Sequence, residues 1–218
     1  MSIQNDMPGF IFYLDGVLID SEKEYSRIWS QINHEFPSGI ENLEQVIKGC
    51  TLPKILNDHY PDKNTQNLVE ARLHELENRM KYDYLPNARE FLEELKRRGL
   101  PVALVTSSDN QKMEHLWEEL PEIRNYFDFI VTGDLVKTSK PSPEGYLLGA
   151  SKIDRKPENC VVFEDSLQGV MAGNNAGSLV VGVIGTLPRE TLAPYSHILI
   201  NDFKEIDLDD LILKLNNR

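Results

Sequence analysis

The sequence predicts an α/β fold, a doubly wound and mostly parallel sheet with an inserted α-helical cap domain. Its apolar runs are continuous rather than alternating, which is typical of strands buried on both faces of a parallel sheet. Helical stretches alternate with these runs from residue 86 to the end of the chain. One connection, from residue 16 to residue 100, takes 85 residues, far more than a crossover helix and its loops need.

The candidate strands share short, wholly apolar stretches that end in polar residues, and they cover residues 10–12, 102–105, 129–131, 161–163, 179–184 and 198–200. Helices are predicted over residues 86–98, 110–120, 143–152, 166–176 and 208–215. The first of them has Pro86 near its start and Gly99 as its C′ residue. This alternation indicates right-handed crossovers in a layered, Rossmann-like sheet.

The long connection is predicted to form a small helical domain because it contains no comparable strand run. Val69, Leu73, Leu76 and Met80 recur at the spacing of an amphipathic helix. The run from Ser21 to Glu24 matches a capping box and is expected to begin the first helix. We therefore predict a cap domain over residues 21–85 and a core domain over residues 1–20 and 86–218.

Composition narrows the class of partner. The chain has 218 residues, 40% of them hydrophobic, and 23 Lys and Arg against 35 Asp and Glu give a net charge of −12. That balance repels nucleic acid and anionic lipid, and the sequence shows no basic patch that would override it. Cys50 and Cys160 stand far apart with no metal-ligand spacing, and no signal peptide or membrane span is evident. We expect a cytoplasmic protein, a monomer or weak dimer, with no nucleic-acid or membrane partner.

Polar residues follow several of the predicted strands. In an open parallel sheet, ligands bind outside the carboxyl ends of the strands. The residues at those ends are Asp15-Gly16, Thr106-Ser107-Ser108 and Glu164-Asp165-Ser166, with Lys140-Pro141 in a further loop. Carboxylates gathered without His or Cys suit Mg²⁺, and hydroxyl and Lys donors beside a metal suit phosphate.

Each motif taken alone also has a plainer interpretation. Asp15-Gly16 could form a turn, Asp165-Ser166 could cap a helix, and Lys140 could be a solvated surface charge. Two other classes of protein remain open at this point. A receiver-like signalling domain gathers similar residues but needs no 85-residue insertion. A structural or interaction protein would bind neither Mg²⁺ nor phosphate.

Taken in order, the motifs resemble those of the haloacid dehalogenase superfamily, and most closely its phosphatase and β-phosphoglucomutase-like branch. The resemblance rests on residues 12–20 (Phe-Tyr-Leu-Asp-Gly-Val-Leu-Ile-Asp), Thr106-Ser107-Ser108, Lys140-Pro141, and Glu164-Asp165-Ser166 with Gly169, Ala172 and Ala176-Gly177. It implies a Mg²⁺-dependent phosphoric monoester hydrolase acting on a small phosphorylated metabolite. In that family an aspartyl-phosphate forms on the first Asp of an Asp-x-Asp pair, and the second Asp is the general acid and base.

The resemblance assigns roles to individual residues. Asp15 would be the acid and base and a main-chain metal ligand, Thr106 a phosphate donor, Lys140 the balancing cation, and Glu164 and Asp165 metal ligands. Further candidates for contact with phosphate or substrate are Gly16, Ser107, Ser108, Asn110 and Lys48. Asn110 could instead cap its helix and Lys48 could be an ordinary surface residue at a helix end. Leu52 and Pro53 stand where the mutases carry a phosphate-binding Arg, which favours a phosphatase over the alternative of a phosphosugar mutase.

One position departs from the family pattern, because Tyr13 stands where the nucleophilic Asp is expected. A phenol with a pKa of about 10 is neutral at pH 7 and is a poor ligand for a hard cation. The substitution predicts impaired phosphoryl transfer and weakened Mg²⁺ affinity, and it leaves open whether the chain is an active enzyme.

Three accounts of Tyr13 fit the sequence. It could be an introduced Asp→Tyr change in an ordinary phosphatase, or it could mark a non-catalytic relative that binds a phosphorylated ligand or a protein. It could also be an unusual covalent nucleophile, although a neighbouring acidic cluster would raise its pKa.

Overall fold

The computed structural model describes residues 7–218 and contains one parallel sheet of six strands. The strands are β1 (Gly9–Phe12), β2 (Val102–Val105), β3 (Phe129–Val131), β4 (Cys160–Glu164), β5 (Leu179–Val183) and β6 (Ile198–Ile200). Their order in the sheet is β3-β2-β1-β4-β5-β6, which confirms the doubly wound parallel prediction. The strand order reverses between β1 and β4, so a ligand site is expected outside the carboxyl ends of these two strands.

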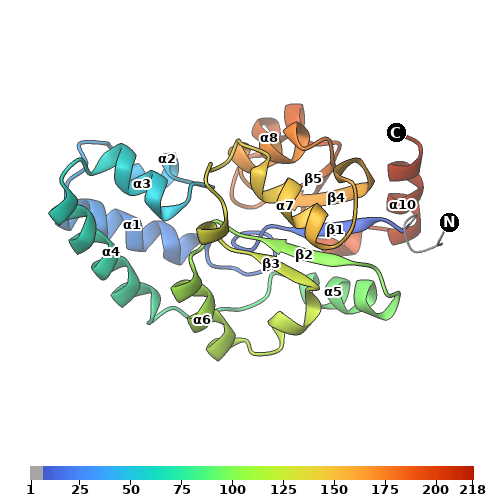
Figure 1. Ribbon diagram of the computed structural model, residues 1–218, viewed down its shortest axis with the longest axis horizontal. Helices are drawn as coiled ribbons and strands as arrows, with labels where there is room; N and C mark the ends of the chain where they lie inside the picture. Colours follow the sequence, from blue (N-terminus) through green and yellow to red (C-terminus); the bar gives the residue numbers. More distant parts are fainter. Residues whose placement is uncertain (1–6) are drawn as a thin grey trace.

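Helices cover both faces of the sheet, which explains why the strand sequences are continuously apolar (Figure 1). One face buries Phe12 and Phe163, whose rings stack 4.5 Å apart, beneath α5 (Ala88–Arg97) and α10 (Leu208–Asn216). The other face buries Ile11 and Val162 beneath α7 (Glu144–Lys152) and α8 (Leu167–Asn175). Successive residues of a strand point to opposite faces, so β1 contributes to both layers.

Between β1 and β2 lies the predicted helical insertion, seen at one end of the molecule in Figure 1. It contains α1 (Glu22–Glu35), α2 (Leu43–Val46), α3 (Leu52–His59) and α4 (Lys63–Glu77). Val69, Leu73 and Leu76 are buried on α4, as their spacing predicted, and Met80 is buried just beyond its end. The exact domain boundaries at residues 21 and 85 stay a prediction.

The remaining helices are α6 (Asn110–Glu119) and the short α9 (Arg189–Leu192). Single 3₁₀ turns occur at Ile123–Tyr126, Gly133–Leu135, Pro157–Asn159, Ala193–Tyr195 and Phe203–Glu205. The helices predicted after residue 85 all form, and none of their ends is shifted by more than two residues. No helix within residues 7–218 has the length and apolar character needed to cross a membrane.

The predicted capping box at the start of α1 is wrong. Ser21 occupies the N-cap position, but its side chain makes no capping hydrogen bond. Its hydroxyl instead donates to the buried carboxylate of Asp15. The hydrogen bond to the charged Asp15 carboxylate fixes the orientation of the Ser21 hydroxyl, and the hydroxyl oxygen accepts no hydrogen bond from the first-turn amides of α1.

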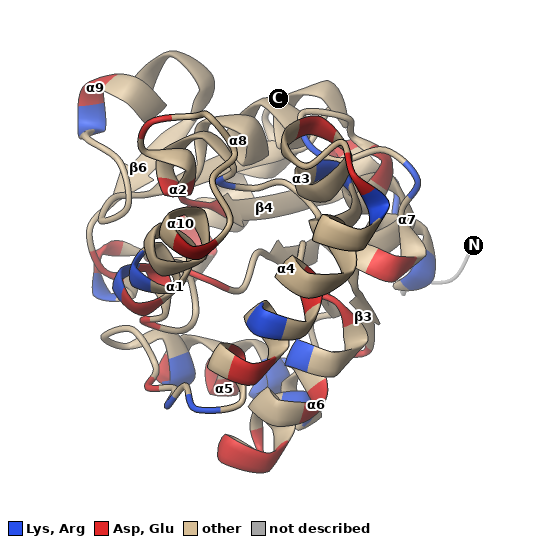
Figure 2. Cartoon of the chain, turned by 90° about the vertical axis from the view of Figure 1, so that its left-hand side faces the viewer, with Lys and Arg blue, Asp and Glu red and all other residues tan. Residues whose placement is uncertain are grey.

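Charges of both signs are interspersed on the face of the molecule that carries the insertion (Figure 2). Several pair on the surface, for example Arg72 with Glu35 at 2.8 Å across α4 and α1. Exposed pairs of this kind contribute about 1 kcal/mol or less each. On this face the Lys and Arg side chains form no separate basic patch, because Asp and Glu lie between them. The chain as a whole has a net charge of −12.

Candidate active site

Four loops predicted to carry the site meet at the carboxyl ends of β1, β2 and β4. The loop after β2 contacts the loop after β1, because the Ser108 hydroxyl donates to Asp15 at 3.3 Å. Within the second loop the Ser108 amide donates to the Thr106 hydroxyl at 3.0 Å. The Lys140 ammonium lies 3.6 Å from the centroid of the Tyr13 ring. The structure therefore brings the loops after β1 and β2 into contact and sets Lys140 against the Tyr13 ring.

The fourth loop is joined to the first through Gly16. Its φ is +73°, and a Cβ atom there would lie 2.1 Å from Oδ2 of Asp165. Only glycine adopts this backbone conformation freely and leaves room for the carboxylate. Gly16 thus permits a close approach of two loops, and it does not line the main cavity described below.

Tyr13 is a neutral, packed side chain at the position of the expected nucleophile. It follows β1 directly, its amide donates to the Phe163 carbonyl at 3.0 Å, and only 6% of the residue is exposed. Burial, followed by the charges of Asp15 and Glu164, raises the pKa of the phenol well above its ordinary value. The oxygen is therefore protonated at neutral pH and cannot attack phosphorus as an anion.

Glu164 has no free oxygen to offer a metal. One carboxylate oxygen pairs with the Lys140 ammonium and accepts from the Tyr146 hydroxyl at 2.6 Å. The other accepts from the amides of Asp165 and Ser166, at 3.0 and 3.1 Å, and from the Ser166 hydroxyl. The side chain is fully buried and is turned toward the start of α8.

Asp165 is the opposite case. It is 1% exposed, and neither of its carboxylate oxygens has a hydrogen-bond partner in the described part of the chain. Burial, followed by the charge of Glu164, raises its pKa well above the ordinary value. An unpartnered buried carboxylate is what a cation site requires, but one such group is not a complete site.

The donors present do not fit Mg²⁺. Asp165 alone has free oxygens, Glu164 is fully bonded, and Tyr13 offers a neutral phenol. Mg²⁺ prefers several hard oxygen ligands in octahedral geometry. Across residues 7–218 no three His, Cys, Asp or Glu side chains gather to hold a metal ion. Asp15 was predicted to bind the metal through its main-chain carbonyl, so Glu164 and Asp165 are the predicted carboxylate ligands, and of these two only Asp165 has unbonded oxygens.

Asp15 is held by three donors that the sequence reasoning did not assign to it. Besides Ser21 and Ser108, the Lys112 ammonium contacts Oδ1 at 2.8 Å, and both partners of that pair are buried. Lys112 lies in the first turn of α6, with its ammonium 4.1 Å from the centroid of the Tyr25 ring. Before it can act as a general acid or base, Asp15 has to leave an ion pair.

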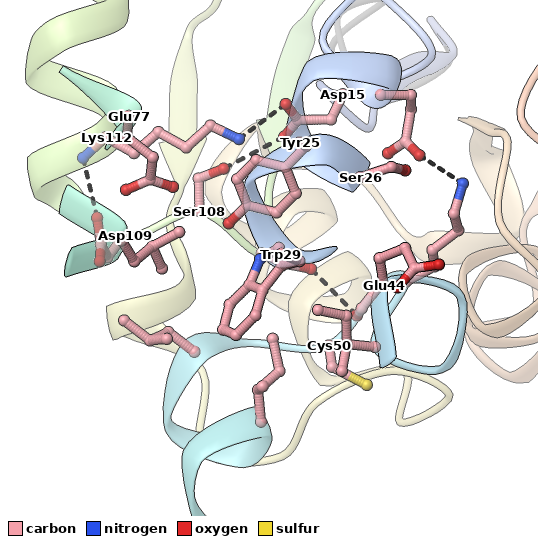
Figure 3. A pocket seen from close by; sticks show the side chains of 18 of the residues that line it. Asp15, Tyr25, Ser26, Trp29, Glu44, Cys50, Glu77, Ser108, Asp109 and Lys112 are labelled. Carbon is pink, nitrogen blue, oxygen red and sulfur yellow. Dashed lines mark hydrogen bonds and ion pairs between the residues drawn. The ribbon is translucent and has the colours of Figure 1, made fainter. Parts of the chain in front are cut away.

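A cavity of about 40 Å³ lies between the insertion and the sheet (Figure 3). We call Tyr13, Asp15, Ser107, Ser108 and Lys112 its core wall, and Tyr25, Trp29, Lys48 and Glu77 its insert wall. Thr106 and Lys140 line a separate cavity of about 20 Å³, which they share with Ser107. The structure therefore divides the predicted phosphate-binding residues between two spaces.

The outlying predicted residues have identified contacts. Lys48 pairs with Glu22 at 2.7 Å while lining the cavity, and the Ser107 hydroxyl donates to the Gly49 carbonyl at 3.1 Å. Asn110 does not cap α6, because Asp109 accepts from the Lys112 amide at that position. The Asn110 side chain accepts from Thr132 instead and does not line the cavity.

Comparison with known proteins agrees with this geometry. A family model described as haloacid dehalogenase-like hydrolase matches residues 10–183. A phosphorylated carbohydrates phosphatase of Thermotoga maritima is 35% identical over 190 residues, covering 83% of this chain and 87% of the relative. Hexitol phosphatase A of Escherichia coli is 33% identical over 181 residues, covering 80% and 82%. The chain belongs to the haloacid dehalogenase-like hydrolases, which confirms the resemblance drawn from its motifs.

The solved structure of a β-phosphoglucomutase from Clostridium difficile has the same fold. It superposes with a TM-score of 0.80, covering 97% of this chain and 98% of the other at 24% identity. At that identity the likeness shows the fold alone. It confirms the parallel sheet with a helical insertion as the shared architecture.

Proposed function

We propose that this chain binds a small phosphorylated metabolite at the cavity between insertion and sheet, and that Tyr13 strongly impairs transfer of the phosphoryl group. The observation that carries the proposal is the buried, protonated Tyr13 at the nucleophile position of a haloacid dehalogenase-like hydrolase. Two relatives, a phosphorylated carbohydrates phosphatase and a hexitol phosphatase, support a phosphorylated small molecule as ligand.

The surroundings of Tyr13 support the same proposal. Lys140, the cation expected to balance a transferring phosphoryl group, is neutralised by Glu164 and lies over the Tyr13 ring. Asp15, the expected acid and base, is neutralised by Lys112. A buried ion pair gives up a partner only at considerable cost, so these charges are not free for a substrate without rearrangement.

Phosphomonoester turnover tests the proposal. Mg²⁺-dependent phosphate release from p-nitrophenyl phosphate should be close to background for the unmodified chain. Tyr13→Asp places a second free carboxylate beside Asp165 and should raise kcat/KM on the order of 10⁴-fold, the scale on which covalent nucleophiles contribute. Tyr13→Phe is the matched control, because it keeps the ring and removes only the hydroxyl.

The outcomes separate the three accounts of Tyr13. Brisk turnover by both the unmodified chain and Tyr13→Phe would show that residue 13 is not the nucleophile position. Turnover that Tyr13→Phe abolishes would identify the phenol as a covalent nucleophile. A silent Tyr13→Asp variant that still binds inorganic phosphate would favour a non-catalytic binding protein, for which the Asp15–Lys112 pair is the supporting observation.

A phosphatase-like site is also favoured over a mutase-like one. Leu52, which stands at the place of the mutases' phosphate-binding Arg, is buried and lines the cavity with an apolar side chain. Transfer between two positions of a sugar requires a second anion to be held in the same site. The insert wall offers Lys48 for that purpose, and Lys48 is paired with Glu22.

A further inference from the structure

The cavity between the core wall and the insert wall is closed in this structure. Its volume is about 40 Å³, which is room for about three water-sized groups at about 15 Å³ each. A tetrahedral phosphate group is larger than that, so even the phosphate of the proposed ligand does not fit between the walls as they stand. The ligand can enter only after the insertion has moved away from the sheet.

The first turn of α6 reaches from the core to the insertion. At its N-cap, the carboxylate of Asp109 lies 2.9 Å from Nε2 of His74 in the last turn of α4. In the same turn, the Lys112 ammonium lies 4.1 Å from the centroid of the Tyr25 ring in α1 while it pairs with Asp15 (Figure 3). One turn of a core helix thus contacts two helices of the insertion.

These contacts are shielded from solvent. Lys112 is buried, and the side chains of His74 and Asp109 are 15% and 19% exposed. The hydrogen bond with Asp109 raises the pKa of His74 above its ordinary value, which favours the charged imidazolium opposite the carboxylate. Because solvent screens such pairs less than exposed ones, they hold the two parts of the chain together more strongly.

Two hydrogen bonds between neutral groups join the insertion to the core at a second place. The Ser107 hydroxyl donates to the Gly49 carbonyl at 3.1 Å. The hydroxyls of Thr51 and Ser139 lie 2.6 Å apart. Hydrogen bonds to charged groups are stronger than those between neutral ones, so the contacts of α6 are the more important of the two sets.

The two linkers between core and insertion do not cross the cavity. They run side by side, because the Leu85 amide donates to the Leu18 carbonyl and the Asp20 amide to the Asp83 carbonyl, both at 2.9 Å. These hydrogen bonds can persist while the walls separate. Opening therefore requires the contacts of α6 to break, and the linkers can stay paired.

We propose that the first turn of α6 clasps the insertion shut over the cavity in the free protein, through Asp109 to His74 and through Lys112 to Tyr25. This inference rests on the proposed function for the chemistry of the ligand. A ligand that binds only the open fraction of the molecules has its apparent affinity lowered by that fraction. The clasp is therefore an autoinhibitory contact, and weakening it should increase both opening and affinity.

Labelling of one buried thiol measures opening without any ligand. Ser108→Cys in a Cys50→Ser background places that thiol on the core wall, where residue 108 is 7% exposed. Iodoacetamide is too large for the closed cavity, so the introduced thiol reacts only in open molecules. Cys160, which is buried in the sheet, reports global unfolding in the same sample. Peptide mass spectrometry separates the two rates.

Two substitutions weaken the clasp and leave Lys112 in place. Asp109→Asn removes a charge but keeps a residue that caps helices well, and His74→Leu removes the other partner. His74→Leu should speed labelling of the introduced thiol about tenfold, the scale of one hydrogen bond to a charged group. Asp109→Asn should speed it severalfold, and the double variant should open no faster than His74→Leu alone.

Calorimetry with inorganic phosphate tests whether the clasp limits binding. His74→Leu should bind phosphate about tenfold more tightly, in proportion to the larger open fraction. Because this substitution removes a positive charge, tighter binding cannot come from charge attraction. Arg72→Leu is the matched control, since Arg72 lies on the same helix but pairs with Glu35 inside the insertion. It should change neither the labelling rate nor the affinity.

The outcomes separate the clasp from the proposed function. The clasp would be overturned by labelling as fast as in urea, by rates that neither substitution changes, or by an increase that Cys160 shares. Faster labelling with unchanged phosphate affinity would show that the contact does not inhibit binding, which also overturns the inference. Variants that open as expected while no form of the chain binds phosphate would overturn the proposed function and leave the clasp standing.

Discussion

The two walls of the cavity differ in how their polar groups are satisfied. On the core wall Asp15 has three donors, and behind that wall Lys140 pairs with Glu164. On the insert wall Glu77 is 2% exposed and forms no ion pair within the described residues. The core wall therefore compensates its buried charges within the fold, whereas the insert wall leaves the charge of Glu77 without a partner cation.

The largest expected effect on stability would break the core wall. Lys112→Met removes one partner of a buried ion pair and leaves Asp15 buried with its charge uncompensated, so it should destabilise the fold by about 3–5 kcal/mol. Urea unfolding monitored by tryptophan fluorescence measures this. The double variant Lys112→Met with Asp15→Asn should recover most of the loss, and additive losses in the two variants would contradict the pair's importance.

A smaller effect on the free energy of unfolding is expected for Glu77→Gln on the insert wall. This substitution should stabilise the fold, by an amount that depends on pH. Burial raises the pKa of Glu77 to about 7 in the folded protein, so the folded state holds a proton that the unfolded state releases near pH 4.5. Stability from this group is therefore present below pH 4.5 and is lost as the pH rises through 7. The Glu77→Gln variant should not lose stability in this way, because a glutamine side chain does not titrate.

The stability gained by Glu77→Gln over the unmodified chain should therefore grow by up to about 3 kcal/mol between pH 4.5 and pH 8. Unfolding free energies measured at several pH values across that range provide the test. A flat difference for Glu77→Gln would mean that the carboxylate is solvated or paired, and the contrast between the walls would disappear.

The smallest expected effect concerns Ser21. Ser21→Ala should cost about 1–2 kcal/mol, because it removes a hydrogen bond to the charged Asp15. A double-mutant cycle with Asp15→Asn distinguishes this role from helix capping. Coupling between the two positions supports the hydrogen bond, whereas additive losses would return Ser21 to the capping role that the sequence suggested.

The fold was predictable because its signals are local and repeated. Continuous apolar runs and interrupting helices determine a parallel sheet, and the loops after β1, β2 and β4 contain the polar residues that converge in space. The partners of those residues were not predictable in the same way. Lys112 and Tyr146 lie on helices whose inward turns bring them to Asp15 and Glu164, and sequence spacing does not encode that approach.

The wrong prediction of a capping box has the same cause, which is a contact that sequence spacing does not encode. Ser21 matches a capping pattern, but its hydroxyl is oriented by Asp15, which lies outside that pattern. The contacts of Glu164 with the start of α8 also lie outside any motif, and its role as a metal ligand stays a prediction. Tyr13 is the exception, because a departure from a family motif is visible in the residue itself.

The packing of Tyr13 has one more consequence. Its ring belongs to the same apolar cluster as Phe12 and Phe163, so the side chain at the position of the expected nucleophile also helps to hold the sheet together. A carboxylate in its place would remove a ring from that cluster and add a charge, so the Tyr13→Asp variant should unfold more readily than the unmodified chain. Reactivity and stability would thus compete for a single position.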